Sequence, residues 1–510
     1  MNQSFNQELS HILKTILIES RGTPIYLVGG SVRDWFLGVQ SHDLDFCLND
    51  SPVPLARRVA NALQAGVFLL DEERETIRVV VSPQKGPVTF LDFARFRERD
   101  LEEDLRKRDL TINAMAIPLQ EAFCIPSASL SVLDPCGGLQ DLKGKVLRAC
   151  SSSSFDDDPA RVLRLVRFAQ KLEFRIEDST FQLARSAVPL LGSVSAERKR
   201  DEIFQILEGK KVRLGIDLLD RLNALSVIFP ELDKLKGVQQ SPPHVQDVWH
   251  HTLETVSRLE LLLKVLAEDL SEQSPTGLFA AQASLWLGRY REQFKAHFNQ
   301  RINPLRLLRG LTFFSALYHD VGKPDTAFED ENGRIRFFNH EEASKSLAVL
   351  RARSLALSND EVEHIQKVIS GHMRIHWLVS EEKEPSPRAI YRFYRDFGDA
   401  GIDICLLSLA DLWATYSYTL TSDRWVNELK ICKILLEARW EKETALVTPP
   451  KLVNGEDLIR EFNLQPGPLI GKILQAIREA QVEGLVTDKP SALTFAREWI
   501  ANWSPHQKED

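Results

Sequence analysis

The apolar positions of the N-terminal third alternate between helical and extended spacing. Apolar residues recur every three or four positions over residues 1–20, which predicts a helix. A short apolar run then ends at Gly29-Gly30, where a strand gives way to a second helix. The further elements expected are the strands 25–28, 44–48, 76–81 and 88–93, the helix 32–37 and a helical hairpin over 102–117. This mixture of strands and helices predicts one α/β domain over 1–150.

Beyond residue 150 the pattern is helical throughout. Residues 151–240 are rich in Lys and Arg, and a break at Ser241-Pro242-Pro243 is typical of a linker. We therefore expect an all-α neck over 151–240, a second helical domain over 241–420 and a helical C-terminal region over 421–510.

Composition narrows the class of protein. A chain of 510 residues is long enough for several domains, and its net charge of −8 argues against a surface coated in basic residues. It has no apolar run of eighteen or more residues, so we expect no membrane span. Six scattered cysteines suit reduced thiols, which favours a cytoplasmic location.

The first candidate chemistry lies at the Gly29-Gly30 turn. Backbone N–H groups at such a turn can approach phosphate oxygens, and Arg33 could supply a forked donor to a triphosphate. Asp43 and Asp45 follow on the next predicted strand, where alternation places both carboxylates on one face. Two carboxylates that close repel unless a cation lies between them, and carboxylates and phosphates are ligands that Mg²⁺ prefers. The alternative is a solvated strand edge.

At this point the chain resembles the class II tRNA nucleotidyltransferase and poly(A) polymerase family, a branch of the polymerase-β-like nucleotidyltransferases. Five ordered segments between about residues 25 and 230 are similar to the family's motifs. They are Gly29–Asp34 with Asp43-Leu44-Asp45, Lys107–Ala114, Asp134–Arg148, Asp157–Arg167 and Ser195–Arg198.

The resemblance implies a polymerase-β-like nucleotidyltransferase head followed by all-α neck, HD and tail domains. It implies transfer of a nucleotide to tRNA with two Mg²⁺ ions at Asp43 and Asp45 and release of pyrophosphate. It also implies a nucleotide-binding set made of Gly29, Gly30, Arg33, Asp34, Arg108, Asp109, Asn113, Asp158, Arg161, Arg164 and Arg167. Asp109 could instead cap a helix beginning at Leu110.

Asp158 and Arg161 are expected to choose the nucleotide. They lie three apart, which predicts that they share one face of a helix. A carboxylate can accept from N4 of cytosine while a guanidinium donates to N3 and O2, and adenine presents a similar order of donor and acceptor. The alternative is that Asp158 only caps a helix before Pro159. Arg164 and Arg167 are expected to extend a basic face toward phosphates.

The segment between Phe90 and Leu105 is short. In the family, enzymes that complete C-C-A usually carry a flexible loop here that is associated with A addition, and enzymes that add only C-C lack it. Residues 98–100 lead directly into an acidic helix, which leaves almost no room for that loop. The resemblance therefore favours a CC-adding enzyme that uses CTP. A full CCA-adding enzyme that also uses ATP, and a poly(A) polymerase, stay open as alternatives.

A second constellation of histidines and aspartates lies further along the chain. The order His, His-Asp, Asp resembles the HD phosphohydrolase superfamily, and an adjacent His-Asp followed by Gly322-Lys323 is a specific signal. The resemblance implies a metal site for Mg²⁺ or a divalent transition metal. Its ligands would be His251, His319, Asp320 and Asp411, with His340 and His372 as a second site. An HD-type phosphohydrolase whose head only binds RNA is thus an alternative from a different class. The oligomeric state stays open.

Overall fold

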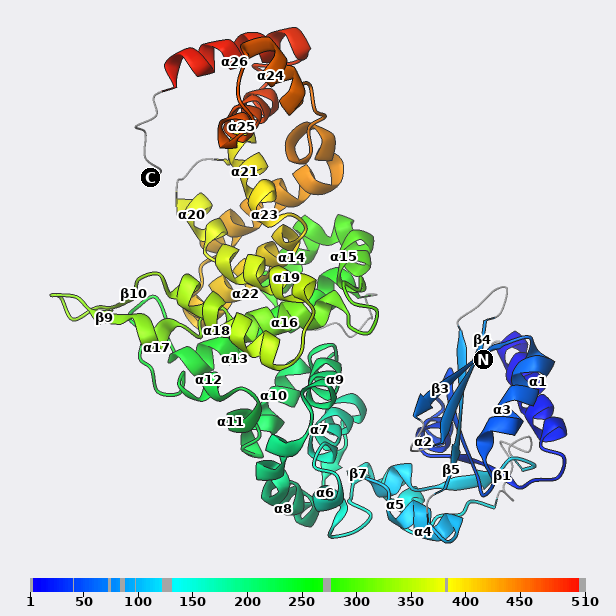
Figure 1. The fold of residues 1–510 in the computed structure, drawn as a ribbon. Coiled ribbons are helices and arrows are strands. Elements are labelled where there is room, and N and C mark those ends of the chain that lie inside the picture. Colours follow the sequence, from blue (N-terminus) through cyan, green and yellow to red (C-terminus); the bar gives the residue numbers. More distant parts are fainter. Residues whose placement is uncertain are drawn as a thin grey trace. The chain divides into compact units, whose positions relative to one another are not determined.

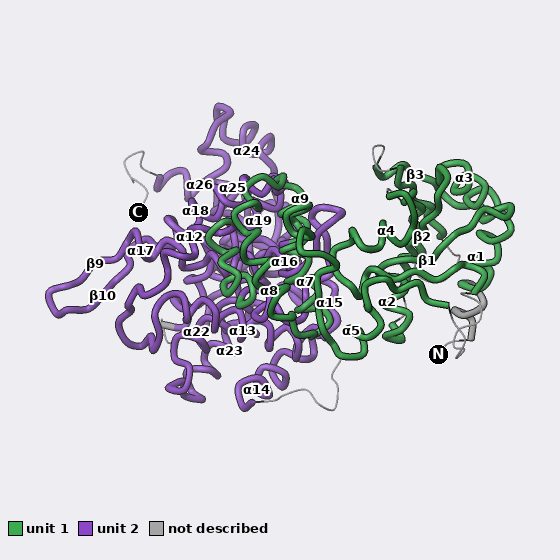
Figure 2. The backbone as a smooth tube through the Cα atoms, turned by 90° about the horizontal axis from the view of Figure 1, so that it is seen from below, with its two compact units in different colours: residues 1–202, 217–227 green, residues 203–216, 228–510 purple. Residues whose placement is uncertain are grey.

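We describe the protein from a computed structural model. The described residues are 3–39, 41–71, 75–82, 88–96, 98–121, 131–268, 277–380 and 384–503. The chain forms two compact units (Figure 2), which are residues 1–202 with 217–227 and residues 203–216 with 228–510. Among the described residues, no helix combines the length and the apolar character that a membrane crossing requires.

The first unit is built on a six-stranded sheet with the strand order β3-β4-β5-β2-β1-β6 (Figure 1). Strands β2 and β5 pair in parallel, and the other neighbours pair antiparallel. The strands are β1 (Ile25–Val28), β2 (Asp43–Leu48), β3 (Gly66–Asp71), β4 (Thr76–Val81), β5 (Thr89–Arg95) and β6 (Ala116–Pro118). The sequence pattern predicted β1, β2, β4 and β5 but missed the edge strand β3.

Helix α3 (Pro52–Leu63) packs on β4 and β5, and α1 (Gln3–Glu19) packs on α3. Pro52 stands in the first turn of α3, where a missing N–H costs nothing, and Leu55, Ala56 and Val59 are buried at helical spacing. Below them the rings of Phe46 and Phe93 stack at 5.1 Å between β2 and β5. This core holds the two parallel strands rigidly side by side.

The predicted helical hairpin over 102–117 is wrong. Only α4 (Leu101–Arg106) is helical, followed by a 3₁₀ turn at Thr111–Asn113 and then β6. The backbone N–H of Thr111 donates to the carbonyl of Arg148, and Leu110 forms an isolated bridge with Ala149. Pairing with a distant segment therefore replaces the helical hydrogen bonds.

The rest of the first unit is helical apart from the short pair β7 (Val146–Leu147) and β8 (Arg175–Ile176). Its further helices are α2 (Gly30–Phe36), α5 (Gly138–Gly144), α6 (Ser154–Asp157), α7 (Arg161–Leu172) and α8 (Asp178–Ala187). Three more helices contain a boundary between the two units, and these are α9 (Ala196–Leu207), α10 (Val212–Arg221) and α11 (Leu225–Ile228).

The second unit contains one β-hairpin in a stretch expected to be entirely helical. Strands β9 (Ala327–Glu329) and β10 (Ile335–Phe337) pair antiparallel. The Asp330 carboxylate accepts from the backbone N–H groups of Asn332 and Arg334, and Gly333 has φ +73°. These local bonds favour a turn over a helix.

The helices of the second unit form its core around α13, α16, α19 and α22. They are α12 (Pro230–Asp233), α13 (Val248–Ala267), α14 (Leu278–Leu287), α15 (Arg291–Phe298), α16 (Leu308–Tyr318), α17 (Lys323–Thr326), α18 (His340–Ser354), α19 (Asn359–Gly371), α20 (Arg374–Ser380), α21 (Pro387–Phe397), α22 (Ala400–Tyr416), α23 (Ser422–Glu441), α24 (Gly455–Phe462), α25 (Pro468–Val482) and α26 (Lys489–Asn502).

Candidate functional site

The Gly29-Gly30 turn joins β1 to α2 and approaches two charged side chains. Gly29 has φ +67°, a conformation that residues with a side chain rarely adopt. A Cβ atom placed there would lie 2.9 Å from Nη1 of Arg108 and 3.7 Å from Oδ2 of Asp45. Glycine therefore lets the backbone pass directly over the guanidinium and the carboxylate.

Asp43 and Asp45 lie on the same face of β2, as the alternation predicted. Asp43 is exposed and Asp45 is half-buried. Burial raises the pKa of Asp45, and the negative charges of Asp92 and Asp43 raise it further, whereas Arg108 opposes the shift. Asp43 and Asp92 therefore act on Asp45 through their charge, and carboxylates are ligands that divalent cations prefer, although among the described residues the oxygens of the three aspartates do not all lie within 4.8 Å of one another.

Asp92 is an acidic residue that the sequence pattern did not single out. It pairs in register with Asp45 across the parallel strands β2 and β5, and Arg78 holds it through two hydrogen bonds of 2.7 Å. The available signal was one acidic position in the otherwise apolar run from Phe90 to Phe93. Only the strand pairing places that carboxylate beside the catalytic candidates.

Arg33 is buried rather than open to solvent. Its guanidinium donates to Oδ1 of Asn113 at 2.6 Å and to Oδ1 of Asp34 at 2.7 Å, and it lies 5.0 Å from the ring centre of Phe168. The expected triphosphate donor is therefore occupied within the protein. Arg108 is the guanidinium that lies beside Gly29 and Asp45.

Asp109 connects the head to the neck helix α7. Arg164 donates to Oδ2 of Asp109 from two nitrogens, at 2.8 and 2.9 Å, and Asn113 and the backbone N–H of Leu110 donate to Oδ1. Burial alone would raise the pKa of Asp109, but the charge and hydrogen bonds of Arg164 lower it to about 2. Asp109 is thus an ionised, buried anchor for α7.

We expect Asp109→Asn to reduce the free energy of unfolding by about 2–3 kcal/mol at neutral pH, because Arg164 loses a charged partner. The folded-state pKa of about 2 lies below the ordinary 3.8, so this carboxylate stabilises the fold above pH ~4 and the contribution is lost as the pH falls toward 2. Urea unfolding between pH 3 and pH 7 measures both effects. The exposed Asp156→Asn serves as the control, and equal curves for the two variants would contradict the role of Asp109.

Arg164 and Arg167 do not form an open basic face, contrary to expectation. Glu202 of α9 accepts from Nε of Arg167 at 2.7 Å and lies 3.7 Å from Arg164. Both guanidinium groups also lie over the ring of Phe168, at 5.7 and 4.6 Å from its centre. Phe168 is therefore surrounded by three arginines, since Arg33 contacts the same ring.

Asp158 and Arg161 are not on one helix face, which corrects the prediction. Asp158 has an extended backbone, and α7 begins only at Arg161 because Pro159 disfavours a helical residue before it. Arg198 donates to both Asp158 oxygens at 2.8 and 2.9 Å, and Arg161 donates to the carbonyls of Lys107 and Ser154. Asp158 still lies only three residues before Arg161, the first residue of α7.

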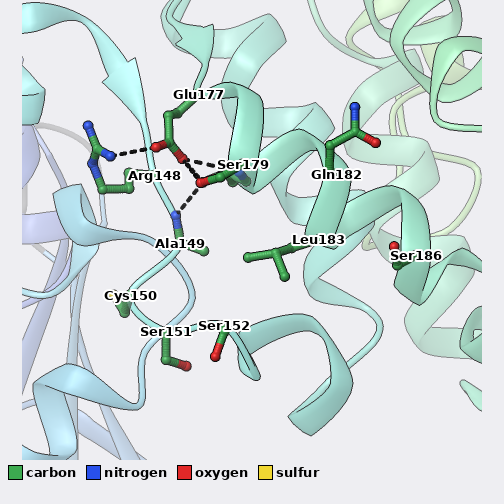
Figure 3. A pocket seen from close by; sticks show the side chains of 11 residues that line it. Arg148, Ala149, Cys150, Ser151, Ser152, Glu177, Ser179, Gln182, Leu183 and Ser186 are labelled. Atoms are coloured by element: carbon green, nitrogen blue, oxygen red, sulfur yellow. Dashed lines mark hydrogen bonds and ion pairs between the residues drawn. The ribbon is translucent and has the colours of Figure 1, made fainter.

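A cavity of about 740 Å³ lies between residues 148–152 and helix α8 (Figure 3). Residues Gln182, Leu183 and Ser186 of α8 line one side, and Cys150–Ser152 line the other. Arg148 also lines the cavity, and its guanidinium already forms ion pairs with Asp141 and Glu177. The cavity contains none of the predicted nucleotide-binding residues.

The second cluster, which we call the Asp320 cluster, gathers side chains from α13, α18 and α22 and from the ends of α16 and α19. Two groups have the spacing of metal ligands, namely His251 with His319 and Asp320, and Asp320 with His340 and His372. Asp320 belongs to both, and each of its oxygens faces one group. Oδ1 of Asp411 lies 2.9 Å from Nε2 of His251. The structure thus brings together all six residues expected from the sequence.

Three histidines of the Asp320 cluster are oriented by backbone carbonyls. Nδ1 of His319, His340 and His372 contacts the carbonyls of Ala316, Phe337 and Ile369 at 2.7, 3.0 and 2.6 Å. This leaves each Nε2 directed into the cluster. Nε2 of His251 lies 2.9 Å from Asp411 and Nε2 of His319 lies 3.2 Å from Asp320, but among the described residues neither contact has the geometry of a hydrogen bond. A backbone acceptor on the far nitrogen is typical of metal-binding histidine, so the donor set fits divalent cations.

Close packing holds the two groups of the Asp320 cluster together. A Cβ atom at Gly322 would lie 2.6 Å from the Cβ of Ala343 and the backbone N of Ser344, so glycine lets the turn after Asp320 touch α18. Lys323 contacts Asp320 at 2.6 Å and donates to Gln240. His376, which the sequence analysis did not single out, contacts Asp411 at 3.0 Å.

Three family models match separate parts of the chain. The Poly A polymerase head domain matches residues 25–148, the probable RNA and SrmB-binding site of polymerase A matches 173–236, and the putative tRNA nucleotidyltransferase domain 2 matches 436–496. The first of these contains the Gly-Gly turn and all three aspartates.

Relatives match almost the whole chain. The A-adding tRNA nucleotidyltransferase of Deinococcus radiodurans is 30% identical over 480 residues, 93% of this chain and 95% of the relative. The CC-adding tRNA nucleotidyltransferase of Thermus thermophilus is 30% identical over 479 residues, 92% and 93% of the two chains. Among solved structures, a CCA-adding enzyme with CTP has a TM-score of 0.60 at 22% identity, covering 98% and 96% of the two chains. A similarity at that identity shows the fold alone.

Proposed function

This chain belongs to the tRNA nucleotidyltransferase family, and from that premise we propose that it adds cytidylate, and no adenylate, to the 3′ end of tRNA. The A-adding and CC-adding relatives are equally identical to it, so overall similarity does not select the nucleotide. The connection between β5 and α4 supports the choice.

That connection spans only residues 96–100 and is held at both ends. The backbone N–H of Phe96 donates to the carbonyl of Leu48, and its ring packs against the head core. Asp100 caps α4 by accepting from the backbone N–H of Glu103 at 2.9 Å. The few residues between β5 and α4 and the anchoring of Phe96 and Asp100 support an enzyme without the flexible loop that the family associates with A addition.

We propose that Asp43, Asp45 and Asp92 hold magnesium and that the Gly29-Gly30 turn with Arg108 receives the triphosphate. Bound magnesium would neutralise charge on the triphosphate and favour the ionised form of the attacking tRNA hydroxyl. Arg33 and Asn113, which are hydrogen-bonded to each other, hold the turn in place. Asp109 holds α7 against the head.

We propose that Asp158 and Arg161 recognise the cytosine edge. The ion pair between Asp158 and Arg198 is partly exposed, at 24% and 48% of the two side chains, so it contributes little stability and a base can replace Arg198 at low cost. Arg161 donates to the backbone carbonyls of Lys107 and Arg108, directly after α4, which fixes its guanidinium beside the backbone of Arg108.

The test incubates the purified protein with tRNA that lacks the terminal C-C-A, or with tRNA that ends in C-C, and with labelled CTP or ATP. We expect two cytidylates on the first tRNA and nothing on the second. Adenylate on the C-C end would contradict the proposal and favour a CCA-adding or A-adding enzyme. Addition of long adenylate tails would favour a poly(A) polymerase.

A second activity is favoured by the Asp320 cluster. We propose that it holds two divalent metal ions that share Asp320, one with His251, His319 and Asp411 and the other with His340 and His372. A carboxylate that is shared by two metal ions is suited to a site that hydrolyses phosphoesters. The substrates that fit the superfamily resemblance are phosphate or cyclic phosphate ends of RNA.

A further inference from the structure

The two oxygens of Asp411 face different partners. Oδ1 lies 2.9 Å from Nε2 of His251 and 3.7 Å from Nε2 of His319, on the side of the Asp320 cluster. Oδ2 lies 3.0 Å from Nε2 of His376, which belongs to α20. One oxygen is therefore directed toward the candidate metal site, and the other is occupied outside it.

His376 is held through both ring nitrogens. Its Nδ1 lies 2.9 Å from Oε1 of Glu428, a residue of α23 that is only 1% exposed. Glu428 in turn accepts a hydrogen bond from the hydroxyl of Ser408 on α22. The imidazole cannot rotate without losing a contact to a buried carboxylate, so its position is set by two helices other than its own.

We propose that His376 and Glu428 are positioning residues that hold Asp411 so that only Oδ1 is presented to a metal ion bound with His251 and His319. The inference rests on the proposed metal centre of the Asp320 cluster. A carboxylate fixed at one oxygen binds a cation through the other, and hydrogen-bond partners of ligands commonly tune metal affinity. His376 itself contacts the far oxygen and is not one of the ligands.

The same helix α22 offers a matched control. His297 is buried, and its Nε2 lies 2.8 Å from Oδ2 of Asp403, two turns before Asp411 on α22. This pair has the same chemistry as His376 with Asp411 and is more deeply buried. Among the described residues, Asp403 contacts none of the grouped metal ligands, whereas Oδ1 of Asp411 lies 2.9 Å from Nε2 of His251. A purely structural role for such a pair should give the two histidines similar effects on stability and none on metal binding.

The experiment titrates metal-free, full-length protein with Mn²⁺ by calorimetry and compares the two binding steps that Asp320→Asn removes. We expect His376→Leu to weaken one of the two steps by about 10–100-fold and to leave the other unchanged, with His376→Gln intermediate because its amide still donates to Asp411. His297→Gln should bind Mn²⁺ like the unmodified protein. Thermal unfolding followed by circular dichroism, with a transition like that of the unmodified protein, shows that each variant is folded.

If His376→Leu does not fold, Glu428→Gln provides the second variant, since it weakens the hold on His376 and should weaken the same step. Unchanged Mn²⁺ affinity in both variants would overturn the positioning role.

Two other results separate this inference from its premise. Asp411→Asn should weaken the same step as His376→Leu, and if it does so while His376→Leu does not, only the positioning role is wrong. An unmodified protein that binds no Mn²⁺ would remove the metal centre and the inference together.

Discussion

Replacing Asp45 by Asn is expected to reduce nucleotidyl transfer by about 10³-fold or more, because a lost metal carboxylate removes several kcal/mol of transition-state stabilisation. Asn keeps the shape of the side chain and can still meet the hydroxyl of Ser31, which contacts Asp45 at 3.4 Å. The measurement is incorporation of labelled CTP into tRNA that lacks C-C-A, at saturating substrate. The exposed Asp50→Asn near the end of the same strand serves as the control.

The three-carboxylate arrangement also predicts an order of effects. Asp43→Asn should be about as damaging as Asp45→Asn, since both side chains face the same cation site. Asp92→Asn should be damaging as well, and it additionally releases Arg78, which donates two hydrogen bonds to it. Full transfer by Asp45→Asn would show that the metal site has been assigned to the wrong residues.

Asp320→Asn is expected to remove both metal ions from the second unit and to abolish phosphoester hydrolysis there, because one carboxylate serves both groups of ligands. Metal content after dialysis, measured by mass spectrometry, should fall by two equivalents. Hydrolysis of a 2′,3′-cyclic nucleotide should fall with it, by about 10³-fold or more if it depends on the metals. Transfer of cytidylate should be unaffected, since the head has its own carboxylates.

His340→Ala is the matched variant for that experiment. It should remove one metal ion and leave the group around His251 intact, because His340 belongs to only one of the two ligand sets. If Asp320→Asn keeps both metals, the shared role of Asp320 is wrong. If it loses both metals while hydrolysis persists, the activity lies elsewhere in the chain.

The sequence predicted the parts of the head that depend on local pattern. The family, the nucleotidyltransferase fold and the tRNA nucleotidyltransferase activity are confirmed by relatives that match almost the whole chain. Strand β2 was predictable because Asp43 and Asp45 alternate with apolar residues. The turn was predictable because a Gly-Gly pair marks a break between two periodic segments.

What escaped prediction depends on pairing between distant segments. Asp92 lies beside Asp45 only because β2 and β5 pair in parallel, which no local spacing reveals. The segment after Arg106 has helical composition, but the backbone N–H of Thr111 donates to the carbonyl of Arg148 instead. The environment of Arg33 was equally hidden, since both Asn113 and Phe168 are far from it in sequence.

If the start of α7 recognises the base and the Gly-Gly turn receives the triphosphate, as proposed, Phe168 links these two parts of the first unit. One of the guanidinium groups on its ring belongs to α2, directly after the Gly-Gly turn, and the other two belong to α7, which begins beside Asp158. A mismatched base that displaced α7 slightly would then also displace Arg33 and the backbone of the Gly29-Gly30 turn. Fidelity in this enzyme would then depend on an aromatic residue that touches neither the base nor the metal.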